Sequence, residues 1–413
     1  MMTSRIYIHV PFCASKCEYC SFYSIPSPGP GDIDAYLDKM EKDFKRDSHH
    51  CGEIESIFIG GGTPTYLSAE HLGKLFSLIN SFFHISADAE ISIECNPETL
   101  TAEKAEIIAD FSNRVSLGIQ SFNPEFRRML GRQGDPESIK KAIRLLVDNG
   151  IANIGCDLIY AIPGQSLDDW TEELNKAAAL PLKHISAYSL TIEEGTLLSK
   201  RISNAECRND SNTRHLTPES SLLKQTTEDR RQVTGLGNQT HNSSARQTAT
   251  DHGQLTTDFS VEMWHLTGTL LKKHGFKRYE ISNYSKRTFE CRHNLEIWYG
   301  DKYLGFGPAA SSFDGKKRWT NVSNLEKWMS GAKPEFDIIS PEKRAREIFV
   351  MGLRTSQGWD KKYFLNRTGF SVDKLRKELD PLLNLRLLAE SAENIKCTSK
   401  GLLLWNEVAE RLI

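Results

Sequence analysis

Three cysteines near the N-terminus offer the most specific chemistry of the chain. Cys13, Cys17 and Cys20 are spaced C-x3-C-x2-C, and no fourth cysteine follows them at once. Iron–sulfur clusters are held by cysteine thiolates, so three thiolates can ligate three irons of a [4Fe–4S] cube. The fourth iron would keep an open coordination position, as sites for chemistry do. A zinc site is the alternative, but zinc sites usually combine two paired C-x2-C or C/H halves, and we see no second half.

The C-x3-C-x2-C motif, with Tyr19 before its last cysteine, resembles the signature of the radical S-adenosylmethionine (SAM) superfamily. In that superfamily the open iron binds the amino and carboxylate groups of SAM, and an electron from the cluster cleaves SAM to a 5′-deoxyadenosyl radical. The cofactors carry this chemistry, while the protein positions and shields them. The resemblance therefore implies a [4Fe–4S] cluster on the three cysteines and SAM as a second cofactor. It assigns no catalytic side chain beyond the cluster ligands.

Alternating apolar runs and amphipathic segments must position these cysteines. Strands are predicted at residues 6–10, 56–59, 91–95, 115–119, 154–159 and 184–189, and helices at 32–46, 69–83, 102–109, 136–149 and 167–179. Repeated βα units imply a parallel sheet with right-handed crossovers, and these are too few for a closed TIM-type barrel. They suit the open (β/α)6 partial barrel of radical SAM proteins, so we predict that α/β fold. The cysteines follow the first strand's carboxyl end, where α/β proteins place their sites.

Polar residues near the strand ends are similar to the SAM contacts of the superfamily. The GGGTPT turn after the second strand can approach a ligand closely, because glycine has no side chain. The resemblance assigns SAM contacts to Tyr7, Gly61, Gly62, Thr63, Glu94, Gln120, Arg132 and Asp157. Some have ordinary alternatives: Tyr7 as core packing, Glu94 as a solvated strand end, and Arg132 as a surface charge.

Later motifs narrow the resemblance to the HemN and HemW branch of the superfamily. The sixth strand and its exit read HISAYSLTIEEGT, and YEISNY, HNLEIW and GFGPAA follow. In the chaperone part of this branch the histidine of HNxxYW is implicated in haem binding. The resemblance therefore makes His293 a haem ligand, although Ile297 replaces the tyrosine of the motif. The alternative is a His-Asn pair that completes local backbone hydrogen bonds.

Phe22 bears on the choice between two activities. The oxidase part of the branch typically extends the cysteine motif to C-x3-C-x2-C-x-C, whereas Phe22 occupies the last position here, as in the chaperones. The resemblance thus implies a haem chaperone that binds a cluster, SAM and haem and delivers haem to apo-haemoproteins. The alternative is an oxygen-independent coproporphyrinogen III oxidase that makes protoporphyrinogen IX. Whether the chain is an enzyme stays open. The partners implied are haem or a porphyrinogen and a reductant such as flavodoxin or ferredoxin.

Composition divides the chain into four predicted parts. Residues 1–203 form the partial barrel, and residues 204–258 are a polar insertion with few apolar residues, which predicts flexibility. Residues 259–335 form an α+β extension that carries His293. Residues 336–413 form a winged-helix-like domain, which we interpret as a lid or substrate-side domain. Its predicted helices lie at 344–354, 360–368, 372–382 and 399–412, with a hairpin at 387–397.

Charge and hydropathy exclude some classes of partner. Among 413 residues, 52 Lys and Arg oppose 54 Asp and Glu, a net charge of −2, so nucleic acid is not expected. We find no apolar run near the ~20 residues of a membrane span and no signal peptide. A cytoplasmic location is therefore expected, with membrane association only through a recipient protein. Solitary cysteines outside the motif fit a reducing compartment, and a homodimer stays open.

Overall fold

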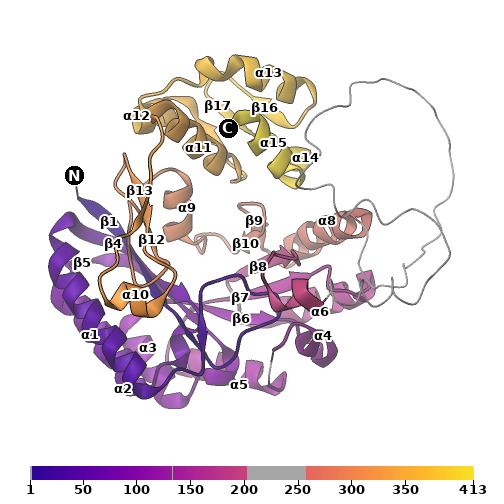
Figure 1. Ribbon diagram of the computed structural model, residues 1–413. Helices are drawn as coiled ribbons and strands as arrows, with labels where there is room; N and C mark the ends of the chain where they lie inside the picture. The colour runs from indigo at the N-terminus through magenta and orange to yellow at the C-terminus, as the bar shows by residue number, and fades with distance from the viewer. Residues whose placement is uncertain (1, 133, 202–256) are drawn as a thin grey trace, which may run out of the picture.

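The computed structural model describes residues 2–132, 134–201 and 257–413 (Figure 1). The polar insertion predicted at 204–258 lies outside the described residues except for its last two positions, which begin a helix. No helix in these described ranges combines the length and apolar character needed to cross a bilayer.

A nine-stranded sheet among the described residues forms the centre of the molecule (Figure 1). Its parallel strands follow one another as β1 (Thr3–Val10), β4 (Cys51–Gly61), β5 (Ile85–Cys95), β6 (Arg114–Gln120), β7 (Asn153–Tyr160) and β8 (His184–Ser189). The predicted strands and the open (β/α)6 arrangement are therefore confirmed. Two of the strands, β4 and β5, begin at least five residues before their predicted starts.

Helices connect the strands and cover the outside of the sheet (Figure 1). They are α1 (Pro30–Asp47), α2 (Ala69–Phe82), α3 (Ala102–Phe111), the short α4 (Pro124–Met129), α5 (Glu137–Asp148) and α6 (Leu167–Ala179). Side-chain caps set several starts: Ser68 accepts the His71 N–H before α2, and Ser166 and Asp169 form a capping box at α6. The five predicted helices are confirmed, whereas α4 was not predicted.

Segments after residue 256 extend both edges of the sheet. Strand β11 (Leu304–Phe306) pairs in parallel with β1, and β10 (Asn283–Ser285) pairs antiparallel with β8 and with β9 (Lys277–Arg278). The prediction of six sheet strands was therefore incomplete, because strands of two or three residues are too short to show a periodic pattern. Helix α8 (Thr257–Lys273) precedes β9, and α9 (Arg292–Trp298) lies between β10 and β11.

A smaller antiparallel sheet follows β11. It contains β12 (Ser311–Phe313), β13 (Arg318–Thr320) and β14 (Glu335–Asp337), with the short helix α10 (Leu325–Met329) before its last strand.

The C-terminal elements gather at one side of the molecule, shown in orange and yellow in Figure 1. They are α11 (Pro341–Leu353), β15 (Trp359–Asp360), α12 (Lys361–Thr368), α13 (Arg376–Asn384), β16 (Leu388–Glu390), β17 (Asn394–Cys397), α14 (Ser399–Leu403) and α15 (Trp405–Leu412). The described strands pair in the order β15-β17-β16, so the predicted hairpin and the winged-helix-like arrangement are present.

The prediction of a single helix at 399–412 is wrong, because the helix is interrupted at Leu404. Two separate packing contacts set the directions of α14 and α15. Gly401 approaches the Leu387 carbonyl so closely that a Cβ would clash with its oxygen, while the Trp405 indole donates to the Val350 carbonyl at 3.3 Å. Tertiary packing therefore overrides a continuous helical pattern here.

Candidate cluster and cofactor site

The cysteine loop begins at the carboxyl end of β1 and closes on itself. Strand β2 (Phe12–Cys13) pairs with β3 (Ile25–Pro26), and the Ser27 N–H donates to the Cys13 carbonyl at 2.9 Å. This short ladder brings the end of the loop back beside its start. The thiols of Cys13, Cys17 and Cys20 are free and partly exposed. The loop therefore presents three thiols at the edge of the sheet where they were predicted.

Two of the thiols have polar neighbours from other strands and loops. Thr63 Oγ1 lies 3.5 Å from Cys13 Sγ, and Arg132 Nη1 lies 3.8 Å from Cys17 Sγ. Burial raises the pKa of the Cys13 thiol, and the hydrogen bond from Thr63 opposes that shift. Both neighbours can donate a hydrogen bond to sulfur, and the thiolate is the form that binds iron. Thr63 and Arg132 thus make the loop suitable for thiolate ligands.

The thiols suit a cluster better than a single metal ion. Within the described ranges, no group of three His, Cys, Asp or Glu residues is arranged to hold one metal ion. Each thiolate of an iron–sulfur cluster binds its own iron, so the thiols need not converge on one point. The three free thiols of the loop can therefore each ligate one iron of a [4Fe–4S] cluster.

The glycine turn after β4 packs directly against the cysteine loop. The Gly62 N–H donates to the Val10 carbonyl at 2.8 Å, and the Thr63 N–H donates to the Phe12 carbonyl at 2.7 Å. A Cβ on Gly62 would lie 2.7 Å from the Phe12 carbonyl oxygen, so a side chain does not fit. Gly61 has a φ of +107°, which favours glycine, and its N–H donates to the Glu94 carboxyl group. The turn therefore joins the loop to β5.

The carboxyl group of Glu94 on β5 lies within electrostatic range of Asp157 on β7. Burial and the neighbouring Asp157 raise the pKa of Glu94 to about 8. Burial also raises the pKa of Asp157, and hydrogen bonds from Ser186 and from Ser116, whose Oγ lies 3.2 Å away, oppose that shift. Glu94 is thus not a solvated strand end. A cationic group placed between these carboxyls would stabilise their ionised forms, so the pair is suited to an ammonium ligand.

Arg132 and Gln120 lie together on the inner side of the cysteine loop. The Arg132 side chain is only 8% exposed and donates to the Gly118 carbonyl, so the alternative of a surface charge is wrong. Gln120 ends β6 with a φ of +69°, which few residues other than glycine adopt. A Cβ on Gly118 would lie 3.2 Å from Gln120 Nε2 and 3.3 Å from Arg132 Nη2. Both side chains therefore lie beside Gly118, and Arg132 also reaches Cys17.

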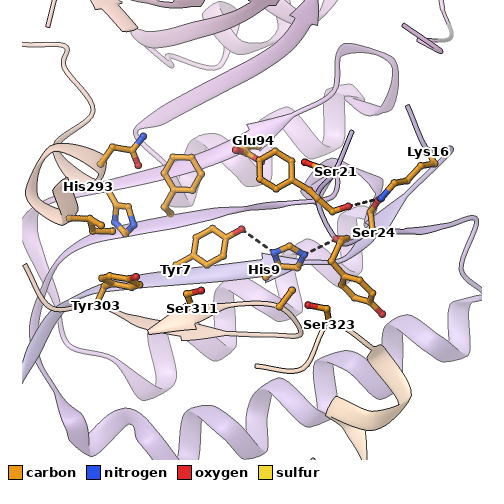
Figure 2. A pocket seen from close by; sticks show the side chains of 16 residues that line it. Tyr7, His9, Lys16, Ser21, Ser24, Glu94, His293, Tyr303, Ser311 and Ser323 are labelled. Atoms are coloured by element: carbon orange, nitrogen blue, oxygen red, sulfur yellow. Dashed lines mark hydrogen bonds between the residues drawn. The ribbon is translucent and has the colours of Figure 1, made fainter. Parts of the chain in front are cut away.

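A cavity of about 740 Å³ opens next to these residues (Figure 2). Tyr7, Glu94 and His293 line it, together with residues of the cysteine loop such as Lys16 and Phe22. The other predicted site residues are not part of its lining and lie around the loop and inside the sheet. The structure thus brings the predicted haem ligand and part of the predicted SAM site to one cavity.

Tyr7 points into the cavity rather than into the core. It alternates along β1 with Ile6 and Ile8, which are fully buried on the opposite face. Its hydroxyl lies 3.0 Å from His9 Nδ1, and His9 Nε2 lies 2.9 Å from the Tyr23 carbonyl oxygen. His9 was not predicted from the sequence. The two-residue period of the strand, which places His9 on the same face as Tyr7, was the signal that would have found it.

Phe58 and Lys16 are further cavity residues that the sequence analysis missed. Phe58 lies between the rings of Tyr7 and His293, with ring centroids 6.3 Å and 5.5 Å away. Figure 2 shows Lys16 at the opposite end of the cavity from His293. A single lysine in a loop and a phenylalanine in a buried strand carry no distinguishing sequence signal.

His293 is the second residue of α9 and is buried, 2% exposed. Its Nδ1 lies 2.9 Å from the Ser56 hydroxyl, 237 positions away in the chain, so its ring does not serve local backbone groups. Burial and the cations of Arg5 and Arg114 lower its pKa to about 3, which keeps the ring neutral. Its Nε2 has no hydrogen-bond partner among the described residues. A neutral imidazole with one open nitrogen is the form that ligates a metal.

Comparisons with known proteins agree with this geometry. The family model described as "Radical SAM superfamily" matches residues 7–177, and the "HemN C-terminal domain" model matches residues 339–404. The solved structure of the radical SAM enzyme coproporphyrinogen III oxidase (HemN) from Escherichia coli matches all of this chain and 90% of its own, with a TM-score of 0.78 at 20% identity. At that identity, the match shows a common fold.

Curated relatives match over nearly their whole lengths. A protein of Bacillus subtilis (strain 168) named "Heme chaperone HemW" is 30% identical, covering 97% of each chain. A protein of the same name from Lactococcus lactis subsp. lactis (strain IL1403) is 29% identical, covering 98% of this chain and 96% of its own. The chain therefore belongs to the radical SAM superfamily, in the branch that contains HemN and HemW.

Proposed function

We propose that this protein is a haem chaperone that binds a [4Fe–4S] cluster, SAM and haem and delivers haem to apo-haemoproteins. The relatives that match the whole chain carry the name of such a chaperone. One structural observation carries the proposal: His293, with an open Nε2, lines the same cavity as residues of the cysteine loop.

The cluster and SAM would bind at the carboxyl ends of the strands. Cys13, Cys17 and Cys20 would hold the cluster, which when bound supplies an iron for SAM and an electron for its cleavage. Around it, Glu94 and Asp157 suit the ammonium group of SAM, as their burial and proximity favour a cation. The remaining contacts proposed for SAM are Tyr7, Gly61, Gly62, Thr63, Gln120 and Arg132.

The cavity suits a flat, largely apolar ligand such as haem. Its volume of about 740 Å³ lies in the range of about 300–1,000 Å³ that is usual for pockets holding one small molecule. Phe58 and Tyr303 supply aromatic walls, and Phe22, which is 67% exposed, lies on the lining. His293 at one end would ligate the iron, and Lys16 at the other end offers a cation for a propionate (Figure 2).

The oxygen-independent coproporphyrinogen III oxidase is the second candidate. The similarity to HemN favours it only at the level of fold, because the identity is 20%. Phe22, in place of a fourth cysteine, favours the chaperone. Both activities would use a reductant such as flavodoxin or ferredoxin, and we place both in the cytoplasm. We propose that an apo-haemoprotein receives the haem. The chain would act as a monomer or a homodimer.

The test supplies each ligand to anaerobically reconstituted protein with SAM and a reductant. In the sample supplied with haem, we expect the wild-type protein to take up about one haem per chain. The His293→Ala variant should show a shifted Soret band. In the coproporphyrinogen III vessel we expect no loss of carbon dioxide by mass spectrometry. Decarboxylated product together with consumption of SAM would instead make the protein an oxidase. Absence of haem uptake would remove the chaperone proposal, and light scattering of the same sample gives the assembly state.

A further inference from the structure

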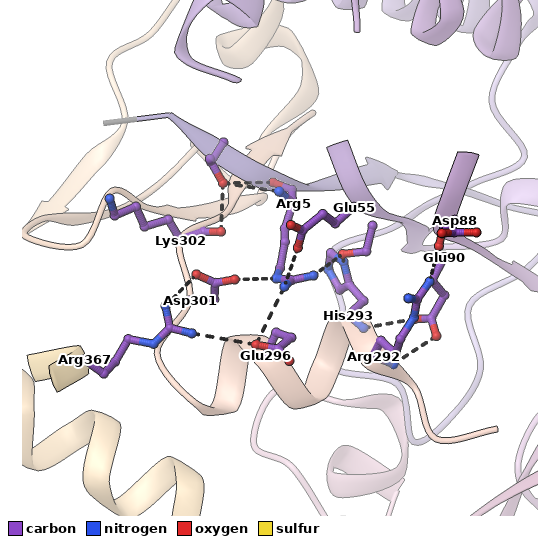
Figure 3. Close-up of polar contacts among 12 residues, drawn as sticks. Arg5, Glu55, Asp88, Glu90, Arg292, His293, Glu296, Asp301, Lys302 and Arg367 are labelled. Carbon is purple, nitrogen blue, oxygen red and sulfur yellow. Dashed lines mark hydrogen bonds and ion pairs between the residues drawn. The ribbon is translucent and has the colours of Figure 1, made fainter. Parts of the chain in front are cut away.

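Two buried side chains on neighbouring strands hold the segment that carries His293 (Figure 3). Ser56 of β4 and Glu90 of β5 are direct register partners in the sheet. Ser56 is fully buried and Glu90 is 5% exposed. Polar side chains buried to this extent are costly unless they are hydrogen-bonded, so their partners identify what they do. Both residues have partners in the segment 291–293, and Ser56 also contacts Arg5.

Glu90 binds the backbone at the start of α9. Its Oε1 accepts the His293 N–H at 3.0 Å, and its Oε2 accepts the Arg292 N–H at 2.9 Å. The Cys291 thiol lies 3.5 Å from the same Oε1. Both carboxylate oxygens are thus used by consecutive residues, so the carboxylate fixes the position of the His293 backbone. This charge-assisted pair is stronger than a neutral pair of hydrogen bonds.

Ser56 binds the imidazole ring itself. Its Oγ lies 2.9 Å from His293 Nδ1 and also accepts a hydrogen bond from Arg5 Nη1 at 3.2 Å. A hydroxyl oxygen has two lone pairs, so it can accept from Arg5 and from a protonated Nδ1 at once. When the proton is on Nδ1, the lone pair of Nε2 is free on the cavity side. A metal-binding histidine usually has its second ring nitrogen held in this way.

We propose that Ser56 and Glu90 are positioning residues for His293: Glu90 fixes its backbone, and Ser56 accepts the Nδ1 proton so that Nε2 faces haem iron. This inference rests on the proposed function, because it assumes that His293 ligates haem. It adds two residues from the barrel strands to a site that the sequence motif places only on α9. Neither residue touches the ligand, so their effect passes through His293.

The principal test compares Ser56→Ala with Ser92→Ala. Ser92 is also buried on β5, but its Oγ lies near Arg114 Nη1 at 3.4 Å rather than near His293. In reconstituted protein we expect Ser56→Ala to weaken haem binding about 10- to 100-fold, the usual effect of removing such a partner. We also expect a changed reduction potential of bound haem. Ser92→Ala should leave both unchanged, and Ser56→Thr, which keeps the hydroxyl, should restore binding.

A second measurement uses the protein without haem. Ring-¹⁵N-labelled histidine reports which nitrogen carries the proton, and His293→Ala identifies the signal. We expect a changed tautomer population in Ser56→Ala and an unchanged one in Ser92→Ala. Glu90→Gln, which removes the charge but keeps one carbonyl oxygen, should broaden or shift the same signal. This readout does not depend on haem binding and also shows whether each variant is folded.

The outcomes separate this inference from the proposed function. If His293→Ala binds haem with the wild-type spectrum and affinity, His293 is not the ligand and the premise fails. If His293→Ala changes the spectrum while Ser56→Ala keeps the wild-type affinity, potential and ¹⁵N shifts, the positioning role alone is overturned. Equal losses in Ser56→Ala and Ser92→Ala would also overturn it, because the effect would then be a general one of the sheet.

Discussion

The backbone N–H of Gly61 donates to Oε2 of Glu94 over 3.1 Å, which joins the glycine turn of β4 to a carboxyl group on β5. The fit is tight, since a Cβ on the preceding Gly60 would lie 2.7 Å from the same oxygen. The turn also contacts the cysteine loop through the Gly62 and Thr63 N–H groups. A substitution at Glu94 or in the turn should therefore change both the free energy of unfolding and the binding of cofactors.

Replacement of Glu94 by Gln should make stability less dependent on pH. The pKa of Glu94 in the folded protein is about 8, above its ordinary value, so the folded state holds the proton more tightly. The contribution of protonated Glu94 to the free energy of unfolding is complete below the pKa that this group has in the unfolded state. As the pH rises above that value, the contribution decreases by about 1.4 kcal/mol per pH unit, until about pH 8. Thermal unfolding at pH 6 and pH 8.5 measures this. Glu94→Gln should lose less stability between the two than wild type, and Glu41→Gln, on the exposed side of α1, should match wild type.

Replacement of Gly62 by Ala should damage the cysteine loop. The new Cβ would lie 2.7 Å from the Phe12 carbonyl oxygen and 2.9 Å from that of Val10, both of which are backbone atoms that cannot move aside independently. We expect a lower unfolding temperature and reduced iron content after reconstitution. Gly73→Ala is the matched control, because no described heavy atom lies within 4 Å of its Cβ position in α2. It should stabilise the protein by about 0.5–1 kcal/mol. Equal behaviour of the two variants would contradict the packing of the turn.

Replacement of Cys17 by Ala should abolish the cluster. With two thiolates left, a cluster that needs three protein ligands is no longer held, and the Arg132 guanidinium loses one of its contacts, that with Cys17 Sγ. Absorbance and iron content of the anaerobically reconstituted protein measure the loss. Cys51→Ala, a solitary cysteine at the start of β4, should keep a full cluster. A complete four-iron load in Cys17→Ala would exclude the assignment.

Replacement of Arg367 by Gln should weaken the contact between the C-terminal elements and residues 296–301. Arg367 on α12 pairs with Asp301 at 2.9 Å, and Asp301 also pairs with the buried Arg5 of β1 at 2.7 Å (Figure 3). We expect faster hydrogen exchange in residues 296–301 and a loss of about 1 kcal/mol, since one member of the pair is partly exposed. Arg144→Gln, exposed on α5, is the control. Unchanged exchange in Arg367→Gln would show that apolar packing alone holds this contact.

The sequence predicted the barrel well, because each of its strands and helices is long enough to show a period. Strand β1, for example, places the fully buried Ile6 and Ile8 on one face and the partly exposed Tyr7 on the other. Residues with a motif, such as the three cysteines and Glu94, were found for the same reason: their types and spacing are local. The roles assigned to them toward SAM stay predictions, which the geometry makes testable.

Contacts between distant segments could not be predicted. Strand β11 has three residues, and nothing local indicates that it pairs with β1. The hydrogen bond between Ser56 and His293 joins positions 237 apart and involves a serine with no motif. The cavity is built from such contacts, so its existence and most of its lining depend on tertiary structure rather than on any one stretch of sequence.

The pairing of β11 with β1 also sets an order of assembly during synthesis. The cysteine loop, the glycine turn and the strands that hold them are complete once the first 63 residues have been made, whereas the outer edge of β1 waits for residue 304. Until then that edge has unpaired backbone groups, which other chains can bind. The part of the cavity wall that carries His293 belongs to the same segment, which is synthesised late. A nascent chain therefore contains the three cysteines of its loop long before the segment that completes the cavity has been made.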